Sequence, residues 1–299
     1  MTHIPVLQKE VIQYIDPKPN ENFIDATIGG GGHALEILKR IGPSGKLMGI
    51  DLDESAIEKL KLKAAGQEAE KRLILACDNF TNLEKIVREN NFGPVQGILA
   101  DLGMSSGQLE ESGRGFSFLK DEPLIMAYNK SQIADGLTAA GILSVKNKEE
   151  LEKIFKEYGE ERFARQIARK IVESRRIKPI RTTLELVNII KSATPFWYHR
   201  LYLHPATRIF QALRIAVNDE LNNLISFLPQ ALNVLVSGGR LIVISFHSLE
   251  DRIVKNLFKE KKQLGLIKIL TKKVIKPTRE ETGINPRSRS AKLRAAVKL

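Results

Sequence analysis

The stretch DATIGGGGHALEIL, residues 25–38, places four consecutive glycines between an apolar run and a segment with helical spacing. In open α/β sheets, ligands bind beyond the carboxyl ends of the strands, and glycine there permits a tight turn and a close approach of the ligand. Asp51 ends the next apolar run, where a carboxylate can accept both hydroxyls of a ribose. The pattern therefore predicts a strand, a glycine turn and a helix that bind a nucleoside-bearing cofactor.

The same alternation of apolar runs and helical patterns continues around the glycines. Strands are expected at 22–28, 45–53, 72–80 and 95–103, with helices between them at 33–41, 54–66 and 82–90. Strands that alternate with helices indicate a parallel, doubly wound sheet. A strong strand follows at 238–247. Two more extended segments, 266–275 and 292–299, have no clear helix between them, which favours a hairpin at the edge of the sheet.

The alternation breaks between residues 111 and 205, where a loop is followed by helical patterns. It resumes with one long amphipathic pattern, which starts at residue 206 and is interrupted by Pro229. We therefore expect one α/β domain built from residues 1–110 and 206–299, with an inserted, mostly helical domain at 111–205.

The net charge of +12 is unevenly distributed along the chain. Residues 1–110 hold 12 basic and 16 acidic side chains (net −4), residues 111–209 hold 18 and 12 (net +6), and residues 210–299 hold 17 and 7 (net +10). This asymmetry indicates an acidic part that handles a small molecule and a basic remainder that faces nucleic acid. The alternative is charge spread over solvated faces for solubility.

Two cofactors fit the glycine turn. The dinucleotide pattern G-x-G-x-x-G/A falls on Gly29, Gly31 and Ala34, which would indicate a nicotinamide oxidoreductase. S-adenosylmethionine needs the same ribose carboxylate and no pyrophosphate site. The expected terminal strand pair is typical of methyltransferases, so it favours the methyl donor.

Composition excludes several other classes of protein. No apolar run reaches the roughly 18 to 20 residues of a membrane span, and the first residues lack the features of a signal peptide, so we expect a cytoplasmic protein with no membrane partner. The single Cys77 excludes a disulfide framework and a multi-cysteine metal site, and is expected to be a small buried apolar residue. No cluster of histidines and carboxylates requires a metal.

Eight motifs, taken in order, resemble the MraW family, the small-subunit ribosomal RNA methyltransferase H family. The resemblance runs from His3 to Leu299, and the motifs that carry it are HIPVL, DATIGGGGH, GIDLD, ADLGMSSGQLEESGRGFSF, YGEERFARQIARKIV, HPATRIFQALRIAVNDEL, LIVISFHSLEDRIVK and NPRSRSAKLRAAVKL. It implies a Rossmann-like class I methyltransferase sheet. It also implies methylation of the N4 amine of a cytosine in the decoding region of 16S ribosomal RNA, with S-adenosylmethionine as the methyl donor. The implied partner is the small ribosomal subunit, and no obligate protein partner is indicated.

The resemblance also implies the residues that contact the cofactor. Asp51 would hold the ribose, Phe80 would offer a flat face to the adenine, and Asp101 would reach the methionine or adenosine part. The full set is Gly31, Gly32, His33, Asp51, Phe80, Asp101 and Gln108.

The family reaction resembles a direct displacement in which the cytosine amine attacks the methyl carbon, and the protein supplies mostly positioning. Acceptors aimed at the amine protons would favour attack, and the candidates are Ser105, Ser106 and His247. For each there is a structural alternative: turn formation for the serines, and a hydrogen bond that steadies the next helix for His247. Ser248 with Asp251 is interpreted as the capping box of that helix.

The target base lies in folded RNA and would have to be unstacked. Phe116 is a candidate stacking face, with packing inside the insertion as the alternative. Arg287 and Arg289 lie before the last strand, together with Lys292 and Arg294, and are candidates for phosphate contacts.

The insertion contains one segment, 160–176, with a clear two-sided pattern. At 100° per residue, Phe163, Ala164, Ile167, Ala168 and Ile171 fall on one side and are expected to be buried. Arg165 and Arg169 fall on the opposite side with Arg162 and Arg176. This arginine stripe predicts an RNA-binding face, and the alternative is a solvated helix face.

One stretch departs from the family pattern Gly-Pro-Leu-Asp-Met-Arg-Met-Asp. Here the chain reads EPLIMAYN, so Ile125, Ala127 and Asn129 replace two acids and an arginine. If those charges matter for RNA, restoring them should raise methylation. The departure keeps open a ribosome-assembly or RNA-binding factor without turnover. A DNA amino-methyltransferase is the third alternative, although its Asn/Asp-Pro-Pro-aromatic motif is replaced by DLGMSS.

Overall fold

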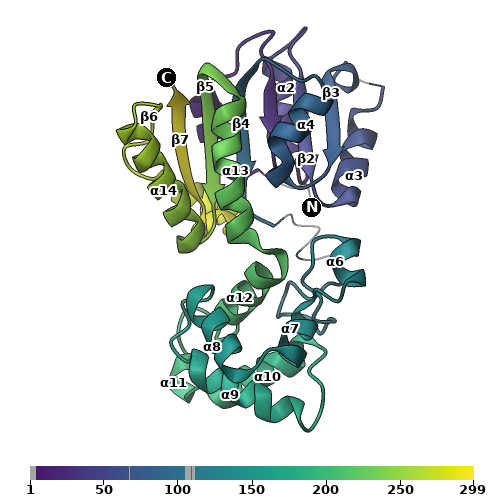
Figure 1. Ribbon diagram of the computed structural model, residues 1–299, viewed down its shortest axis with the longest axis vertical. Helices are drawn as coiled ribbons and strands as arrows, with labels where there is room; N and C mark the ends of the chain where they lie inside the picture. Colours follow the sequence, from purple (N-terminus) through teal and green to yellow (C-terminus); the bar gives the residue numbers. More distant parts are fainter. Residues whose placement is uncertain (1–4, 67, 105–108, 110–111) are drawn as a thin grey trace. The chain divides into compact units, whose positions relative to one another are not determined.

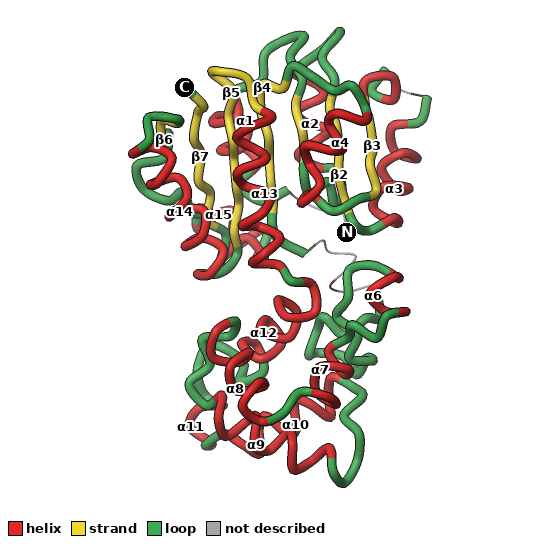
Figure 2. Tube along the Cα trace, in the orientation of Figure 1, coloured by secondary structure: helices red, strands yellow, loops and turns green. Residues whose placement is uncertain are grey.

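The computed structural model describes residues 5–66, 68–104, 109 and 112–299. It contains a seven-stranded sheet with the order β3-β2-β1-β4-β5-β7-β6 (Figures 1 and 2). The five strands β3, β2, β1, β4 and β5 pair in parallel, whereas β7 pairs antiparallel with both β5 and β6. This topology confirms the predicted Rossmann-like methyltransferase sheet. The strands are β1 (Phe23–Asp25), β2 (Leu47–Asp51), β3 (Leu73–Cys77), β4 (Val95–Asp101), β5 (Leu235–Ser245), β6 (Ile267–Ile269) and β7 (Lys292–Lys298).

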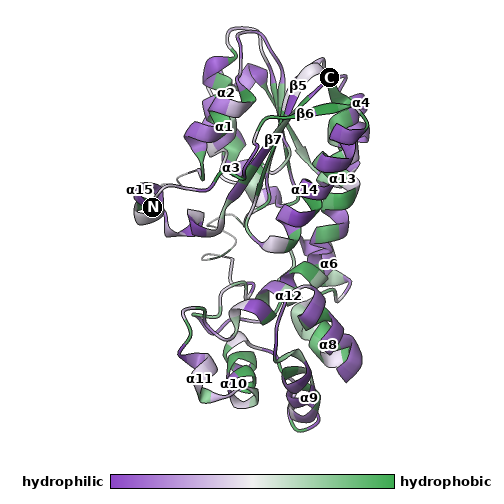
Figure 3. Ribbon diagram, turned by 90° about the vertical axis from the view of Figure 1, so that its left-hand side faces the viewer, coloured by the Kyte–Doolittle hydropathy of each residue, from purple (hydrophilic) through white to green (hydrophobic). Residues whose placement is uncertain are grey.

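Helices cover both faces of the sheet, as Figure 3 shows in side view. One apolar cluster joins the sheet to α1 (Gln8–Ile15), α2 (Gly32–Arg40) and α3 (Glu54–Ala64). The other joins it to α4 (Leu83–Glu89), α13 (Glu220–Val234) and α14 (Ser248–Gln263). Successive strand residues alternate between the two clusters, for example Phe23 and Ile24. Burial of both faces explains why the strands are continuous apolar runs.

Two details of the secondary structure differ from the sequence-based expectation. The pattern that starts at residue 206 is not one helix ending near Pro229. It breaks at Asp219, which adopts a left-handed conformation (φ 50°) between α12 (Thr207–Asn218) and α13, and Pro229 lies inside α13. The strands β6 and β7 do pair, but their connection is not a simple loop because it contains α15 (Arg279–Ile284) and a short 3₁₀ helix, Pro286–Ser290.

The chain divides into two compact units. Unit 1, residues 1–104 and 221–299, contains the sheet. Unit 2, residues 105–220, is mostly helical in its described part, and its helices are α6 (Lys130–Ala134), α7 (Ala139–Val145), α8 (Lys148–Glu157), α9 (Ala164–Arg175), α10 (Thr183–Ala193), α11 (Phe196–His199) and α12. The second boundary therefore follows residue 220 rather than 205, because α12 packs against α7 and α8.

The stretch that departs from the family pattern is well packed in unit 2. Ala127 is fully buried, and Asn129 caps α6 in a reciprocal capping box with Gln132. The guanidinium of Arg114 donates hydrogen bonds to the carbonyl oxygens of Ala127 and Tyr128, at 3.1 and 2.8 Å. The residues present in this stretch therefore fit their own surroundings in unit 2.

We therefore expect Ala127→Arg to destabilise unit 2 instead of raising methylation. A long charged side chain would have to enter a filled, apolar position, which costs about 2 kcal/mol through overpacking and desolvation. Urea unfolding measures the change, with Asn129→Asp as the control, since aspartate also caps helices well. A free energy of unfolding that is unchanged in Ala127→Arg would contradict this interpretation of the stretch.

Cys77 is exposed, so the expectation of a buried cysteine is wrong. It is the last residue of β3, where the strand leaves the sheet. Among the described residues, no helix combines the length and apolar composition that crossing a membrane requires.

Candidate cofactor site

Three aspartates end neighbouring parallel strands of unit 1. Asp25 ends β1, Asp51 ends β2 and Asp101 ends β4. Because the carboxyl ends of parallel strands lie at one edge of a sheet, the three carboxylates share that edge, and their charges affect one another. This is the edge at which open α/β sheets bind ligands.

The glycine turn is held to the sheet by Asp51. The backbone N–H of Gly29 donates to Asp51 Oδ2 at 2.8 Å, and the N–H of Asp53 donates to Oδ1 at 2.8 Å. Both carboxylate oxygens thus accept a backbone hydrogen bond, and an ionised carboxylate can accept up to about four hydrogen bonds in all. Burial raises the pKa of Asp51, while the hydrogen bonds from Asp53 and Gly29 oppose that rise.

The glycines are required partly by the protein itself. Gly31 has a left-handed conformation (φ 75°), and a Cβ there would overlap the side chain of Leu60 on α3. A Cβ on Gly32 would overlap the ring of Pro5. Close packing of Leu60 and Pro5 against the turn therefore excludes side chains here, in addition to any ligand.

His33 and Asp101 contribute buried polar atoms without hydrogen bonds. His33 lies in the first turn of α2, and its Nε2 is 3.6 Å from Asp101 Oδ2. Neither ring nitrogen of His33 nor Asp101 Oδ1 has a hydrogen-bond partner in the described part of the chain. Since buried polar atoms in native proteins are nearly always paired, these three atoms indicate a place for a polar ligand.

Asp25 is a site residue that the sequence did not single out. Its side chain is only 1% exposed, and burial raises its pKa to about 7, with His33 opposing the rise and Asp101 adding to it. Thr27 is another, since its hydroxyl accepts the backbone N–H of Asp101 at 2.7 Å and so ties the ends of β1 and β4 together. Both residues lie inside the quoted stretch 25–38, before the glycines. This position was the signal in the sequence that could have identified them.

Phe80 follows β3 and is partly buried. Its ring packs edge-on against Phe227 of α13, with ring centroids 5.0 Å apart. It therefore supports the apolar cluster on that face of the sheet, and its partial exposure leaves ring surface for another flat group.

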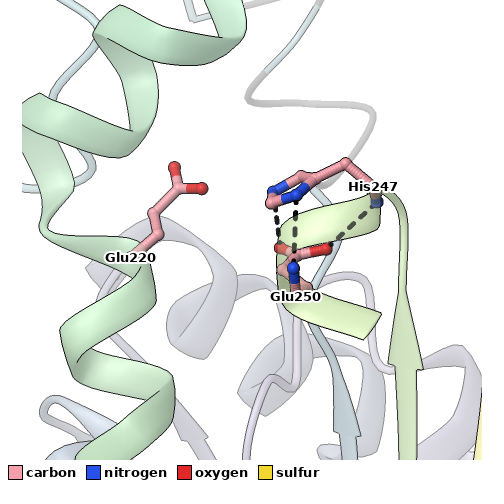
Figure 4. Close-up of side chains that lie close together, drawn as sticks. All are labelled: Glu220, His247 and Glu250. Carbon is pink, nitrogen blue, oxygen red and sulfur yellow. Dashed lines mark hydrogen bonds and ion pairs between the residues drawn. The ribbon is translucent and has the colours of Figure 1, made fainter. Parts of the chain in front are cut away.

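His247 has a structural role at the start of α14 (Figure 4). Its Nδ1 accepts the backbone N–H of Glu250, and the carboxylate of Glu250 accepts the backbone N–H groups of His247 and Phe246. The capping box is thus formed by His247 and Glu250, and the expected pairing of Ser248 with Asp251 is wrong by one residue. Glu220, also drawn in Figure 4, belongs to unit 2, where it binds Arg214 and Tyr128.

The side chain of Asp251 instead forms a two-pronged ion pair with Arg294 of β7, at 2.7 and 3.1 Å. Arg294 therefore stabilises unit 1, and it lies in β7 and not in a loop. Arg287 and Arg289 lie in the 3₁₀ helix before β7, where Arg289 is exposed and Arg287 is partly buried.

The substrate candidates of unit 2 differ in their surroundings. Phe116 is buried and stacked on Tyr128, with centroids 5.7 Å apart, so packing accounts for it and an exposed stacking role is not supported. Helix α9 buries Ala164, Ile167, Ala168 and Ile171, as predicted, whereas Phe163 before its first turn is only partly buried. Arg165 and Arg169 are exposed on its other side, and Arg169 lies 3.7 Å from Glu173 in an exposed pair of the kind that contributes little.

Three further candidates, Ser105, Ser106 and Gln108, lie outside the described residues. The cofactor role of each predicted residue stays a prediction. What the structure brings to one sheet edge is a glycine turn, three carboxylates, a buried histidine and a partly exposed aromatic ring.

Comparison with known proteins identifies relatives of the whole chain. Residues 1–299 match the family model described as the MraW methylase family. A protein named ribosomal RNA small subunit methyltransferase H from Clostridium botulinum (strain 657 / Type Ba4) is 46% identical, with 99% of each chain covered. Proteins of the same name from Halothermothrix orenii and Syntrophotalea carbinolica are 46% and 44% identical, and the matches cover at least 98% of each chain.

Proposed function

This chain belongs to the MraW methylase family and is a methyltransferase, and we propose that it transfers a methyl group from S-adenosylmethionine to the N4 amine of a cytosine in the decoding region of 16S ribosomal RNA. The observation that carries the proposal is the edge of the sheet where Asp25, Asp51 and Asp101 surround the glycine turn. Relatives at 44 to 46% identity named for the small ribosomal subunit support the choice of RNA.

The residues at this edge fit the methyl donor. S-adenosylmethionine supplies a methyl group on a positively charged sulfur that is already activated for displacement. Carboxylates complement that charge, and Asp51 at the end of β2 can accept hydrogen bonds from ribose hydroxyls in addition to those from the backbone. The unpaired atoms of His33 and Asp101 suit the polar groups of the cofactor, and the Phe80 ring suits the adenine. The proposed set of cofactor-binding residues also includes Gly31, Gly32 and Gln108.

The protein contributes mainly positioning to the reaction. S-adenosylmethionine bound at this edge would supply the methyl group to the cytosine N4 with loss of its carbon–sulfur bond, and the amine would release one proton. His247 is a poor acceptor for that proton, because its Nδ1 already accepts the N–H of Glu250 and its Nε2 lies 3.2 Å from the Glu250 carboxylate. We assign His247 to shaping the start of α14 and leave Ser105 and Ser106 as the candidates that orient the amine.

A basic surface on α9 is proposed to bind the RNA backbone, with Arg287 and Arg289 as a second basic segment on unit 1. Replacing Arg165 and Arg169 by Gln is expected to weaken RNA binding and to flatten its dependence on salt. The slope should decrease by somewhat less than one for each phosphate that the variant no longer neutralises. Cofactor affinity should stay the same. Filter binding of small subunits or their RNA at several salt concentrations measures the affinity for RNA and its salt slope.

The matched control is the replacement of Lys255 and Lys259 by Gln. These residues are also exposed and lie four positions apart on a helix, but they belong to α14 of unit 1. Their replacement removes the same amount of positive charge as the arginine variant does. If the arginine and lysine variants show the same salt slope, the effect is one of net charge and α9 is not a specific RNA surface.

Methyl transfer from labelled S-adenosylmethionine tests the proposed function. Purified protein is incubated with small subunits, with free 16S RNA and with DNA. Label in small-subunit RNA is the expected result. Label in DNA would support the amino-methyltransferase of DNA instead, and RNA binding without label would support a factor that has lost turnover.

A further inference from the structure

Unit 2 exposes an unusual group of aromatic side chains around α11. Phe196 is 68% exposed, Trp197 49% and Tyr202 85%, and no other aromatic side chain in the described ranges is exposed to this extent. Exposed apolar groups that gather in one place commonly mark an interaction surface, whereas isolated ones need no explanation. We call Phe196, Trp197 and Tyr202, with Arg162 and Arg200, the α11 surface.

The short helix that carries these rings is firmly anchored. Its third residue, Tyr198, is buried and donates its hydroxyl hydrogen to Glu161 Oε2 at 2.7 Å. Burial, with this hydrogen bond, raises the pKa of Tyr198 to about 12. His199 is joined to Thr194 Oγ1 by a hydrogen bond of 2.8 Å. Because α11 is held from its inner side, Phe196 and Trp197 are presented outward by a fixed backbone.

Arginines lie over the exposed rings. The guanidinium of Arg162 is 4.8 Å from the Trp197 ring centre and 5.0 Å from that of Phe163, and the guanidinium of Arg200 is 4.6 Å from that of Phe196. These distances are typical of cation–π contacts. Residues 191–204 contain Lys191 and Arg200 but no aspartate or glutamate. The α11 surface therefore combines exposed aromatic rings with positive charge.

We propose that the α11 surface binds unpaired nucleotides of the RNA substrate, whose bases stack on Phe196 and Trp197 while Arg162 and Arg200 contact phosphates or bases. Aromatic rings interleaved with cations recognise single-stranded nucleic acid in this way, whereas the bases of a duplex are already stacked on each other. The proposal rests on the proposed function for its RNA substrate. A second copy of the chain is a poor occupant, because each copy carries a net charge of +12.

Trp197 is the only tryptophan of the chain, so its fluorescence reports directly on this surface. The full-length protein is titrated with a short unpaired RNA strand and with the same strand in a duplex. We expect the unpaired strand to quench the fluorescence and the duplex to leave it largely unchanged. Equal quenching by both, or quenching by neither, would overturn the proposal.

Variants separate stacking from charge. Trp197→Ala, and independently Phe196→Ala, should weaken binding of a dye-labelled unpaired strand about 10-fold while the salt slope stays that of the parent, because no cation is removed. Trp197→Phe should retain most of the affinity, since a ring remains. Leu62→Ala, which truncates an exposed apolar residue of α3 in unit 1, is the control and should bind as the parent does. Thermal melting confirms that each variant is folded.

The remaining outcomes are also decisive. If both alanine variants bind the unpaired strand as tightly as the parent but lose self-association in sedimentation, the surface is a protein interface and the proposal is wrong. Methyl transfer is scored separately. Quenching by the unpaired strand without methylation of small subunits would contradict the proposed function alone, and methylation with unchanged binding in both variants would contradict the α11 surface alone.

Discussion

Replacing Asp51 with alanine is expected to weaken S-adenosylmethionine binding by one to two orders of magnitude. The variant would lose the charge-assisted hydrogen bonds that two ribose hydroxyls donate to the carboxylate. These bonds contribute about 2 to 3 kcal/mol to the free energy of binding. The backbone N–H groups of Gly29 and Asp53 lose their acceptor as well, so the melting temperature should also fall. Calorimetric titration with S-adenosylmethionine, well below the melting temperature, measures the affinity.

Two further variants isolate the role of Asp51. Asp51→Asn keeps the size of the side chain but removes its charge, so its affinity should lie between those of the parent and the alanine variant. Asp16→Ala removes a carboxylate that binds Lys18 and Arg240 elsewhere in unit 1 and should leave the affinity unchanged. An Asp51→Ala protein that binds the cofactor as tightly as the parent would remove Asp51 from the site.

Replacing Asp25 with asparagine is expected to stabilise the protein at pH 8. The pKa of Asp25 is raised from 3.8 to about 7, chiefly by burial, so the folded state favours the neutral acid. The stability that this neutral form contributes is fully present below about pH 4 and is lost as the pH rises through about 7. The contribution of Asp25 to the free energy of unfolding is therefore lower by about 4 kcal/mol above pH 7 than below pH 4. Asparagine is neutral at every pH and can keep the bond from the Thr27 N–H, so it should recover this stability.

Urea unfolding of the parent and of Asp25→Asn at pH 4, 6 and 8 measures this effect. The two proteins should have similar free energies of unfolding at pH 4, and the variant should be the more stable at pH 8. Asp16→Asn is the control, since the pKa of Asp16 is lowered by Lys18 and the residue is partly exposed. A gap between parent and variant that does not widen from pH 4 to pH 8 would show that Asp25 is not held neutral by its burial.

The sheet could be predicted from the sequence because the parallel strands β1, β2 and β4 are largely buried on both faces. That burial produces the continuous apolar runs ending at Asp25, Asp51 and Asp101, and the helices between them have clear spacing. The glycine turn could also be predicted from the sequence. Gly31 has a positive φ, and a side chain there would overlap Leu60. Strand ends followed by these residue types predicted a candidate site at the carboxyl edge of the sheet, and Asp25, Asp51 and Asp101 do end neighbouring strands there.

Features that depend on contacts between distant residues could not be predicted. The break at Asp219 arises where α12 leaves its packing on α7 and α8, whereas Pro229 is the stronger local signal. The buried atoms of His33 and Asp101 that have no hydrogen-bond partner among the described residues come together only when α2 and β4 are placed side by side. The sequence did not decide whether Phe116 lies on the surface. In the structure it is buried and stacked on Tyr128.

The same holds for the start of α14. Ser-x-x-Asp at residues 248–251 matches the usual capping pattern, but His247 and Glu250 form the box, because Asp251 is taken by Arg294 of a strand more than 40 residues away. Local propensity identified the helix, and a tertiary ion pair decided which residues cap it.

The chemical identity of the modified nucleoside tests the proposed function most directly. Small-subunit RNA incubated with the protein and S-adenosylmethionine is digested to nucleosides and analysed by mass spectrometry, with Asp51→Ala as the impaired enzyme. The proposed function predicts a new methylated cytidine carrying its methyl group on N4, at one position in the decoding region and at a lower rate with Asp51→Ala. A methyl group on a ring carbon, on adenine or on ribose, or no new nucleoside at all, would contradict it.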